Sequence, residues 1–285
     1  MMTLVGWVVV LGCVMAGYVL HHGNVAVLYQ PTELLIIGGA AVGALLASAS
    51  PHLIKACIAE TIGVVKGSGV SRAKYLELLV CFFELFRLGA TNPVAVESHV
   101  DKPENSEIFK KYPLINHDHH VMDFICNTLV VQLSANMSPY DLEDLMDRDI
   151  AVMHEEEKQV PATLSRISDA LPGLGIVAAV LGVVITMGKL TEGKEVIGQS
   201  VAAALVGTFL GILLCYGIMQ PLAARVEALI EEKGKVFFAC KAGILAFAKG
   251  SKPAVCVEFI RRSIPLEYRP TFKELEEATN KAKAG

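Results

Sequence analysis

The sequence predicts an all-α membrane protein with four transmembrane helices and a helical cytoplasmic domain between the second and third of them. Two observations predict this fold class. Only 19% of the 285 residues are charged, whereas soluble domains carry about 25%. In addition, four long runs contain no Asp, Glu, Lys, Arg or His: residues 1–20, 34–51, 170–188 and 196–224. Charge-free runs of this length are typical of membrane spans.

Each run is long enough to cross a bilayer. An apolar helix of about 20 residues spans the roughly 30 Å hydrocarbon layer. We therefore assign transmembrane helices to residues 1–20, 34–51, 170–188 and 199–222. Buried core helices are the alternative, but four such runs in one chain favour spans. We expect the first run to be retained, because it lacks the basic start and the small-residue cleavage site of a signal peptide.

The distribution of Lys and Arg predicts how the spans are oriented. All but two of the 25 Lys and Arg residues lie in residues 52–169 or after residue 224. Basic residues are favoured on the cytoplasmic side, so residues 52–169 and the tail, 223–285, are expected there. Residues 21–33 then form a periplasmic hairpin and residues 189–198 a periplasmic loop. Both termini are expected in the cytoplasm.

Helix-start signals recur between the second and third spans. Ser71 can cap a helix whose apolar stripe has spacings of three and four: Tyr75, Leu78, Leu79, Phe82, Leu85 and Phe86. Ser138–Asp141 combines a capping Ser, a Pro at the first helical position and an acid three residues after the cap. We expect that helix to run on towards the third span. Gly89–Pro103 is expected to be an exposed loop, because Asn92-Pro93 and Lys102-Pro103 punctuate it.

Residues with nucleophilic or metal-binding side chains form no catalytic pattern. The seven cysteines include no CxxC pair and lie in segments where thiols stay reduced. The cluster His117–His120 contains ligand types, but adjacent residues cannot all converge on one ion and no second cluster completes the set. We interpret it as a solvated helix start. Phosphate loops, nucleophile elbows and paired carboxylates are absent from the sequence, so we expect no enzyme, no metal site and no cofactor.

The predicted spans contain hydroxyl groups but no titratable side chain. Glu33 and Asp169 lie at the mouths of spans. A proton path across a bilayer normally uses titratable groups despite their cost. If this chain conducts protons, another chain must therefore supply the carboxylate. The hydroxyls that could line a polar path are Thr186, Ser200, Thr208 and Tyr216. The alternative is a hydroxyl bonded within its own helix, as Thr208 would be with the Ala204 carbonyl.

Small residues and prolines also mark the spans. Three pairs of small residues four apart allow close helix contact: Gly39 with Gly43, Gly207 with Gly211, and Ala178 with Gly182. Pro172 and Pro221 occupy matching places near the cytoplasmic ends of the third and fourth spans. Each removes a backbone donor and frees the carbonyl four residues earlier. They are either ordinary helix-end prolines or a paired hinge that bends when a partner side chain changes charge.

Several motifs resemble the MotA family of flagellar motor stator proteins. The matching segments occur in family order over nearly the whole chain: Tyr29-Gln30-Pro31 with Glu33-Leu34, Ser106–Phe109, Leu171-Pro172 with Gly175–Val180, Val206–Leu214, Arg269-Pro270 and Glu274–Glu277. The chain is more similar to the proton-driven branch than to the sodium-driven one. The resemblance implies an ion-conducting stator subunit of the bacterial inner (plasma) membrane. Such a subunit couples proton flow, or alternatively sodium flow, to torque on the flagellar rotor.

The resemblance also implies partners and ion-path residues. It implies a homo-pentamer around a dimer of the single-span protein MotB, whose membrane Asp accepts the proton. No nucleic acid is expected. By position, Pro172 and Pro221 match the two functional prolines of the family, and Thr208 matches its channel-facing hydroxyl. We group Thr186 and Ala179 with them as ion-channel and coupling residues.

A rotor contact is implied in the cytoplasmic segment. Glu97 matches the family's acidic residue that contacts the rotor switch protein FliG. The family's basic residue falls at Gly89 in this sequence, and Arg87 is the nearest substitute. The cluster His117–His120 has no family counterpart, which favours its interpretation as a helix start.

Three other functions remain as alternatives. An ExbB- or TolQ-like energiser of outer-membrane processes usually has three spans, whereas this sequence predicts four. A self-contained transporter needs its own polar site at mid-membrane, and the predicted spans show none. A structural membrane scaffold is the third. Co-purification with a single-span partner that carries a membrane Asp separates the stator from the last two.

Overall fold

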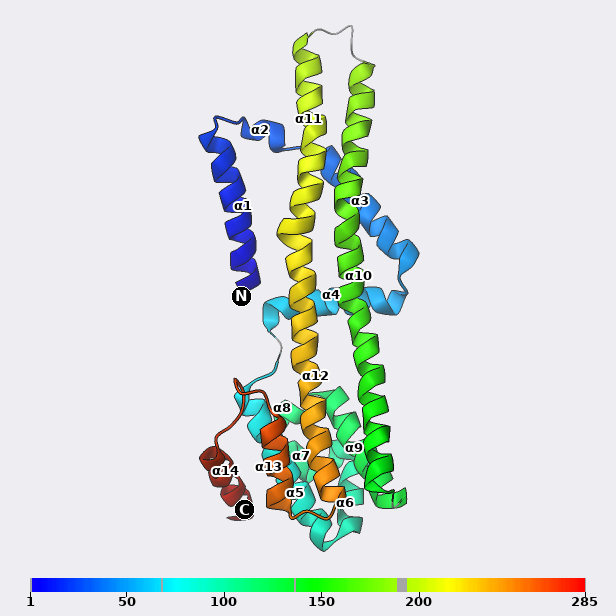
Figure 1. Ribbon diagram of the computed structural model, residues 1–285, viewed down its shortest axis with the longest axis vertical. Coiled ribbons are helices and arrows are strands. Elements are labelled where there is room, and N and C mark those ends of the chain that lie inside the picture. The colour runs from blue at the N-terminus through cyan, green and yellow to red at the C-terminus, as the bar shows by residue number, and fades with distance from the viewer. Residues whose placement is uncertain (1, 68, 136, 189–193, 285) are drawn as a thin grey trace. The chain divides into compact units, whose positions relative to one another are not determined.

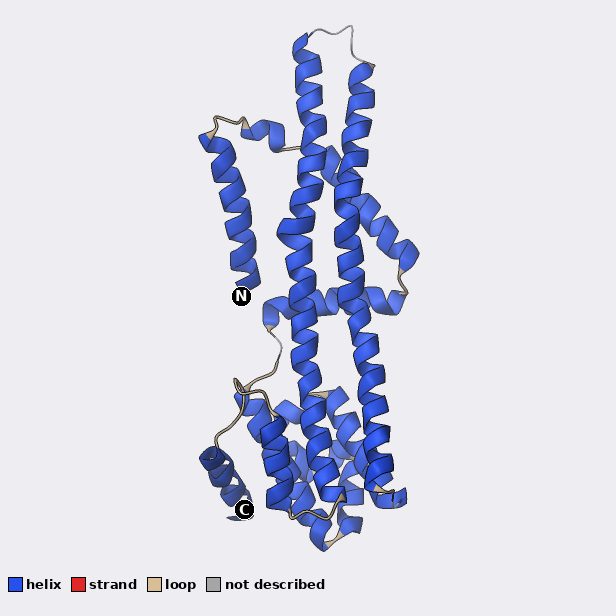
Figure 2. Ribbon diagram, viewed as in Figure 1, coloured by secondary structure: helices blue, strands red, loops and turns tan. Residues whose placement is uncertain are grey.

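The computed structural model describes residues 2–67, 69–135, 137–188 and 194–284. Regular structure in these ranges is helical throughout, without a strand (Figure 2). Four helical segments among them are long and apolar enough to cross a membrane: Met2–Leu20, Val25–Ser48, Pro139–Met187 and Ile197–Ala248. The predicted fold class, an all-α membrane protein with four spans, is confirmed.

The chain folds as two compact units, each built from two separate stretches of sequence. The membrane unit comprises residues 1–68 and 156–230, and the second unit comprises residues 69–155 and 231–285. Most of the predicted tail therefore folds together with the segment between the second and third spans.

The membrane unit holds the four predicted spans. Its helices are α1 (Met2–Leu20), α2 (Val25–Leu28), α3 (Pro31–Ser48), α4 (Pro51–Lys66), the later part of α10 (Pro139–Met187), α11 (Lys194–Ile212), η2 (Leu213–Met219) and the start of α12 (Gln220–Ala248) (Figure 1). One cluster of buried side chains joins α3, α10 and η2: Ile37, Ala41, Leu171, Ala178 and Cys215. No residue of α1 is buried. In the predicted periplasmic loop 189–198, residues 189–193 lie outside the described residues.

Helix α10 begins where the capping signal predicts. The Ser138 hydroxyl oxygen accepts a hydrogen bond from the Asp141 amide at 3.2 Å and donates one to the Asp141 carboxylate at 2.6 Å. Such a cap satisfies a backbone donor that has no partner inside the helix. From Pro139 the helix continues for 49 residues, through Pro161 and Pro172, into the third predicted span. Both the start and the continuation are confirmed.

The second unit is built around α5 (Arg72–Thr91). Ser71 caps it by accepting a hydrogen bond from the Lys74 amide at 3.1 Å, as the sequence predicts. The apolar stripe of this helix is buried, and the ring of Phe86 stacks on that of Phe247 with centroids 4.7 Å apart. Around α5 pack α6 (Pro93–Val100), α8 (Pro113–Asn116), α13 (Pro253–Ser263) and α14 (Phe272–Ala284). The remaining elements of this unit are η1 (Pro103–Asn105), α7 (Glu107–Lys110) and α9 (His119–Ala135).

The prediction of an exposed loop over Gly89–Pro103 is wrong. Helix α5 continues to Thr91, and Pro93–Val100 forms α6, whose residues Val96 and Val100 are buried. The Asn92 side chain accepts a hydrogen bond from the Ala95 amide at 3.3 Å. Asn92-Pro93 is thus a capping residue followed by a proline at the first helical position, which starts a helix rather than a loop.

The cluster His117–His120 marks the start of α9, as predicted. Asp118 accepts a hydrogen bond from the Val121 amide at 3.2 Å, and its other carboxylate oxygen pairs with Lys74 at 2.6 Å. The side chains of His119 and His120 are exposed. No group of three potential metal-ligating side chains occurs among the described residues.

Candidate functional site

Helices α10 and α11 approach each other through glycine. A methyl group placed on Gly211 would lie 2.6 Å from the Leu171 carbonyl oxygen, and one on Gly175 would lie 2.8 Å from the Gly207 carbonyl oxygen. Real carbon atoms do not approach backbone so closely, so any side chain here would push the helices apart. Small residues permit this close approach of two membrane helices. The contact fixes which faces of α10 and α11 meet.

The three predicted small-residue pairs have different environments. Gly207 and Gly211 lie in the contact with α10. Gly182, which pairs with Ala178, meets α11 as well, since a methyl group on it would lie 2.8 Å from the Ala204 Cβ atom. Around Gly39 and Gly43 on α3, no other side chain or helix comes within 4 Å of the added methyl. The pairs on α10 and α11 therefore lie in the contact between these two helices, whereas Gly39 and Gly43 face open space in the single chain.

Pro221 follows a widened, π-helical turn. Residues Leu213–Met219 form this turn, and the Gln220 amide donates to the Cys215 carbonyl, five residues back. Proline lacks the amide proton that would continue the α-helical pattern, and π turns of this kind often mark functional sites. Beside the turn lies a cavity of 490 Å³. Its lining includes Tyr216 and Asp169, and the Asp169 carboxylate accepts a hydrogen bond from the side-chain amide of Gln220 at 3.3 Å.

Pro172 lies within α10, which continues through it without interruption. Ser168, whose carbonyl loses its α-helical donor at Pro172, is fully buried. Its hydroxyl lies 3.3 Å from the Cys215 carbonyl, to which it donates a hydrogen bond. The two proline regions are therefore joined by a direct bond between α10 and the π-helical turn before Pro221.

The predicted hydroxyl groups are placed unequally. Thr186 is buried, and its hydroxyl donates to the Gly182 carbonyl at 2.7 Å, which is the within-helix bond that we set out as the alternative. Ser200 and Thr208 are half-buried, and Tyr216 is exposed. Ala179, also half-buried, has its amide 3.3 Å from the place a Gly207 side chain would occupy.

Glu33 is the residue whose position the sequence did not reveal. It lies in the first turn of α3, but its side chain is only 7% exposed. A methyl group on Gly207 would lie 2.7 Å from the Glu33 Oε2 atom and 3.3 Å from the Ala178 Cβ atom. Ala178 and Gly207 belong to the interior of the charge-free runs 170–188 and 196–224. The expectation that Glu33 lies at a mouth therefore holds for its own span only, because its carboxyl lies beside the middle of the other two.

Residues of the expected rotor contact lie on the surface of the second unit. Glu97, on α6, and Arg87, on α5, are both exposed. Neither makes an ion pair with another described residue. Gly89 is buried, and a methyl group on it would lie 2.9 Å from the Phe247 ring. A basic side chain has no room there, which gives a physical reason for its absence.

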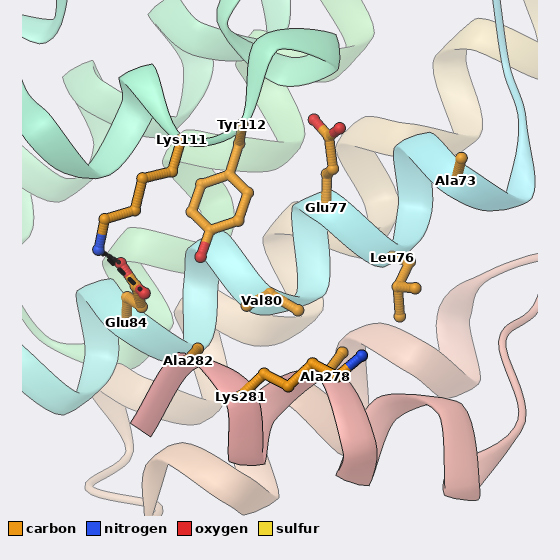
Figure 3. A pocket seen from close by; sticks show the side chains of 10 residues that line it. All are labelled: Ala73, Leu76, Glu77, Val80, Glu84, Lys111, Tyr112, Ala278, Lys281 and Ala282. Atoms are coloured by element: carbon orange, nitrogen blue, oxygen red, sulfur yellow. Dashed lines mark hydrogen bonds and ion pairs between the residues drawn. The ribbon is translucent and has the colours of Figure 1, made fainter. Parts of the chain in front are cut away.

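The second unit also contains a cavity that sequence patterns did not indicate. It has a volume of 620 Å³ and is lined by α5, α14 and the residues around Tyr112 (Figure 3). Glu84, almost buried, pairs with Lys111 at 3.1 Å. Burial, together with the nearby Glu84 carboxylate, raises the pKa of the Tyr112 phenol. Residues this far apart in sequence carry no local signal that would have brought them together.

The sequence and the fold both match known proteins. The family model for Motility protein A N-terminal matches residues 4–93, and that for the MotA/TolQ/ExbB proton channel family matches residues 117–237. The chain is 38% identical to Motility protein A of Salmonella typhimurium over 279 residues, 97% of this chain and 94% of that protein.

Two solved structures share the fold. A chain in the structure of C. jejuni MotAB matches with a TM-score of 0.75 and 20% identity, over 95% of this chain and 98% of that one. A chain in the flagellar MotAB stator complex from Bacillus subtilis matches with a TM-score of 0.68 and 21% identity, over 97% of this chain and 98% of that one. The likeness covers the membrane unit and the second unit alike.

Proposed function

Because this chain belongs to the Motility protein A group of the MotA/TolQ/ExbB proton channel family, we propose that it forms a proton path jointly with a single-span partner. Family membership makes it a stator subunit of the bacterial flagellar motor, a multi-pass protein of the inner membrane and not an enzyme.

The partner that we propose is a MotB dimer, surrounded by five copies of this chain. The single observation that carries this proposal is the 38% identity to Motility protein A along nearly the whole chain. The titles of the two solved structures with this fold describe MotAB assemblies, which supports a partner of the MotB type. In this arrangement an Asp of MotB accepts the proton within the membrane.

The proposed path runs along α10 and along α11, η2 and the start of α12. Pro172, Pro221 and Thr208 are its principal residues, with Thr186 and Ala179 beside them. The hydrogen bond from Ser168 to the Cys215 carbonyl supports a coupled movement, since it joins the two proline regions. Protonation of the MotB Asp removes a charge, and the surrounding subunits then shift relative to the dimer. The membrane potential drives each proton with about 2.3 kcal/mol per 100 mV.

We propose that the second unit delivers the motion to the rotor. Both termini and this unit are then cytoplasmic, in agreement with the distribution of Lys and Arg. The exposed Glu97 and Arg87 contact the rotor switch protein FliG by charge. Rim contacts of this kind depend on salt and respond to charge reversal.

Two experiments test the proposed function. A tagged chain expressed with its motility operon should co-purify with a single-span protein that carries a membrane Asp. A motility-deficient deletion strain complemented by this gene should swim in the absence of sodium. A failure to recover any such partner, together with a failure to restore swimming, would refute the proposal. Swimming that requires sodium would keep the stator and correct the ion.

Replacing Glu97 by Lys should reduce motor torque, because it reverses the charge presented to the rotor. An opposite charge change on the rotor switch protein should restore part of the torque. The measurement is the rotation rate of tethered cells under load. Glu104→Lys, at another exposed acid of the same unit, serves as the control and should leave torque near the wild-type value. Unchanged torque in Glu97→Lys would rule out this contact.

A further inference from the structure

Glu33 carries a carboxyl group into the interior of the membrane unit. Its side chain is 7% exposed, and its Oε2 atom is inaccessible to solvent without a hydrogen-bond donor among the described residues. The atom lies at Gly207 of α11, where the missing side chain leaves room for it. Figure 1 shows α10 and α11 continuing well beyond the start of α3. A methyl group at Gly207 would lie 2.7 Å from the Glu33 Oε2 atom and 3.3 Å from the Ala178 Cβ atom, so the carboxyl lies against α11 at the point where α11 meets α10.

Ordinary structural roles do not account for this carboxyl. An acid in the first turn of a helix commonly turns back to bond the free amides of that turn. Here Oε2 accepts no such bond and points at the neighbouring helix instead. It also forms no ion pair with any residue that the structure describes. A role in capping α3 or in a salt bridge is thus not what holds it in place.

The surroundings of Glu33 contain few other charges. α11, which packs against α3, carries its charged residues, Lys194 and Glu195, in its first turn. α4 follows the opposite end of α3 and carries His52, Lys55, Glu60 and Lys66. On α10, the acid nearest in sequence to Ala178 is Asp169, whose carboxylate accepts a hydrogen bond from the Gln220 side chain. No described cation compensates a negative charge at Glu33, and an unpaired charge in such a place is strongly disfavoured.

We propose that Glu33 is a proton-exchange site of the stator, neutral at rest, which passes protons between the outer side of the membrane and the carboxylate of the partner chain. The inference rests on the proposed function for that second carboxylate. In the step, the O–H bond of neutral Glu33 breaks and an O–H bond forms on the partner carboxylate, directly or through one water. The Glu33 carboxylate then takes a proton from the outer side. One proton moves and no electrons are exchanged.

The first test concerns the charge state of Glu33 in the full chain alone. Infrared spectra of the purified chain in detergent at pH 7 should contain the carbonyl stretch of a protonated carboxyl, which exposed carboxylates do not give. Glu33→Gln should remove this band. Glu156→Gln, at an exposed acid of the same unit, should leave it unchanged. An identical spectrum for the wild type and Glu33→Gln would overturn the inference.

The second test concerns proton flux through the complex with the partner in vesicles, under an imposed membrane potential. Glu33→Gln should lower the flux about a hundredfold, as is usual when a positioned proton-transfer group is lost. Glu33→Asp retains a titratable carboxyl and should keep much more of the flux. A Gln variant that conducts like wild type, or equal losses in Gln and Asp, would overturn the inference. Absent flux in the wild type would instead refute the proposed function, and the infrared band would still decide the state of Glu33.

Discussion

Gly211→Ala is expected to separate α10 from α11 and to abolish motility. The added methyl would lie 2.6 Å from the Leu171 carbonyl oxygen and 2.9 Å from the Gly175 Cα atom. Neither neighbour is the flexible end of a side chain, so the helices themselves must move. Overpacking costs about 1–3 kcal/mol, and contacts this short with backbone atoms favour the upper part of that range, which exceeds the roughly 1 kcal/mol of helix propensity gained by replacing Gly with Ala. The chain should unfold at a lower temperature and assemble poorly with its partner.

Thermal unfolding of the purified chain in detergent, followed by circular dichroism, measures the change. Gly198→Ala is the matched control, because Gly198 lies on the same helix and no other side chain or helix comes within 4 Å of a methyl added there. It should unfold at or slightly above the wild-type temperature. A Gly211→Ala chain as stable as this control would contradict the glycine-mediated contact of α10 and α11.

Pro172→Ala is expected to stop swimming while the protein still inserts and binds its partner. Alanine has the backbone amide that proline lacks, so it can donate a hydrogen bond to the Ser168 carbonyl. This completes the helical hydrogen bonds of that turn and makes α10 stiffer. Because Ser168 also bonds the Cys215 carbonyl before Pro221, the change should impede movement of both proline regions. Stability should be preserved or slightly increased. Motility in soft agar and co-purification with the partner are the two measurements.

A second proline of α10 provides the control for this experiment. Pro161 also lies inside the helix, and Pro161→Ala makes the same chemical change away from the bond between Ser168 and Cys215. We expect cells with Pro161→Ala to swim. Swimming cells with Pro172→Ala would rule out the hinge, whereas a loss of swimming in both variants would point to a general need for flexibility along α10.

Much of the fold could be predicted because the signals are local. The lack of charge identifies each span from its own residues, and Ser138–Asp141 specifies the start of α10 through bonds within one turn. Asn92-Pro93 carried an equally local signal, but the same residues occur in loops and at helix starts. The burial of Val96 and Val100 against the rest of the unit decides between the two.

The position of Glu33 could not be predicted, because a residue at the end of its own span can still lie beside the middle of the neighbouring spans. Counting from its own span, the residue lies at an end. In the structure, α3 begins beside the interior of α10 and α11, so the same residue lies beside their middle. Similarly, the buried Gly89 gives no sign in the sequence that Phe247, far away along the chain, occupies the space beside it.

The π-helical turn at Leu213–Met219 also changes which side of α12 lines up with a given side of α11. A π turn holds one residue more than an α turn, and each residue of an α-helix rotates the chain by about 100°. The side of α11 that faces α10 is therefore not continued on α12 by counting in steps of 3.6 residues. A single helical wheel drawn from Lys194 to Ala248 would assign the later residues to the wrong sides. Residues on α12 should instead be assigned with the count restarted after Met219.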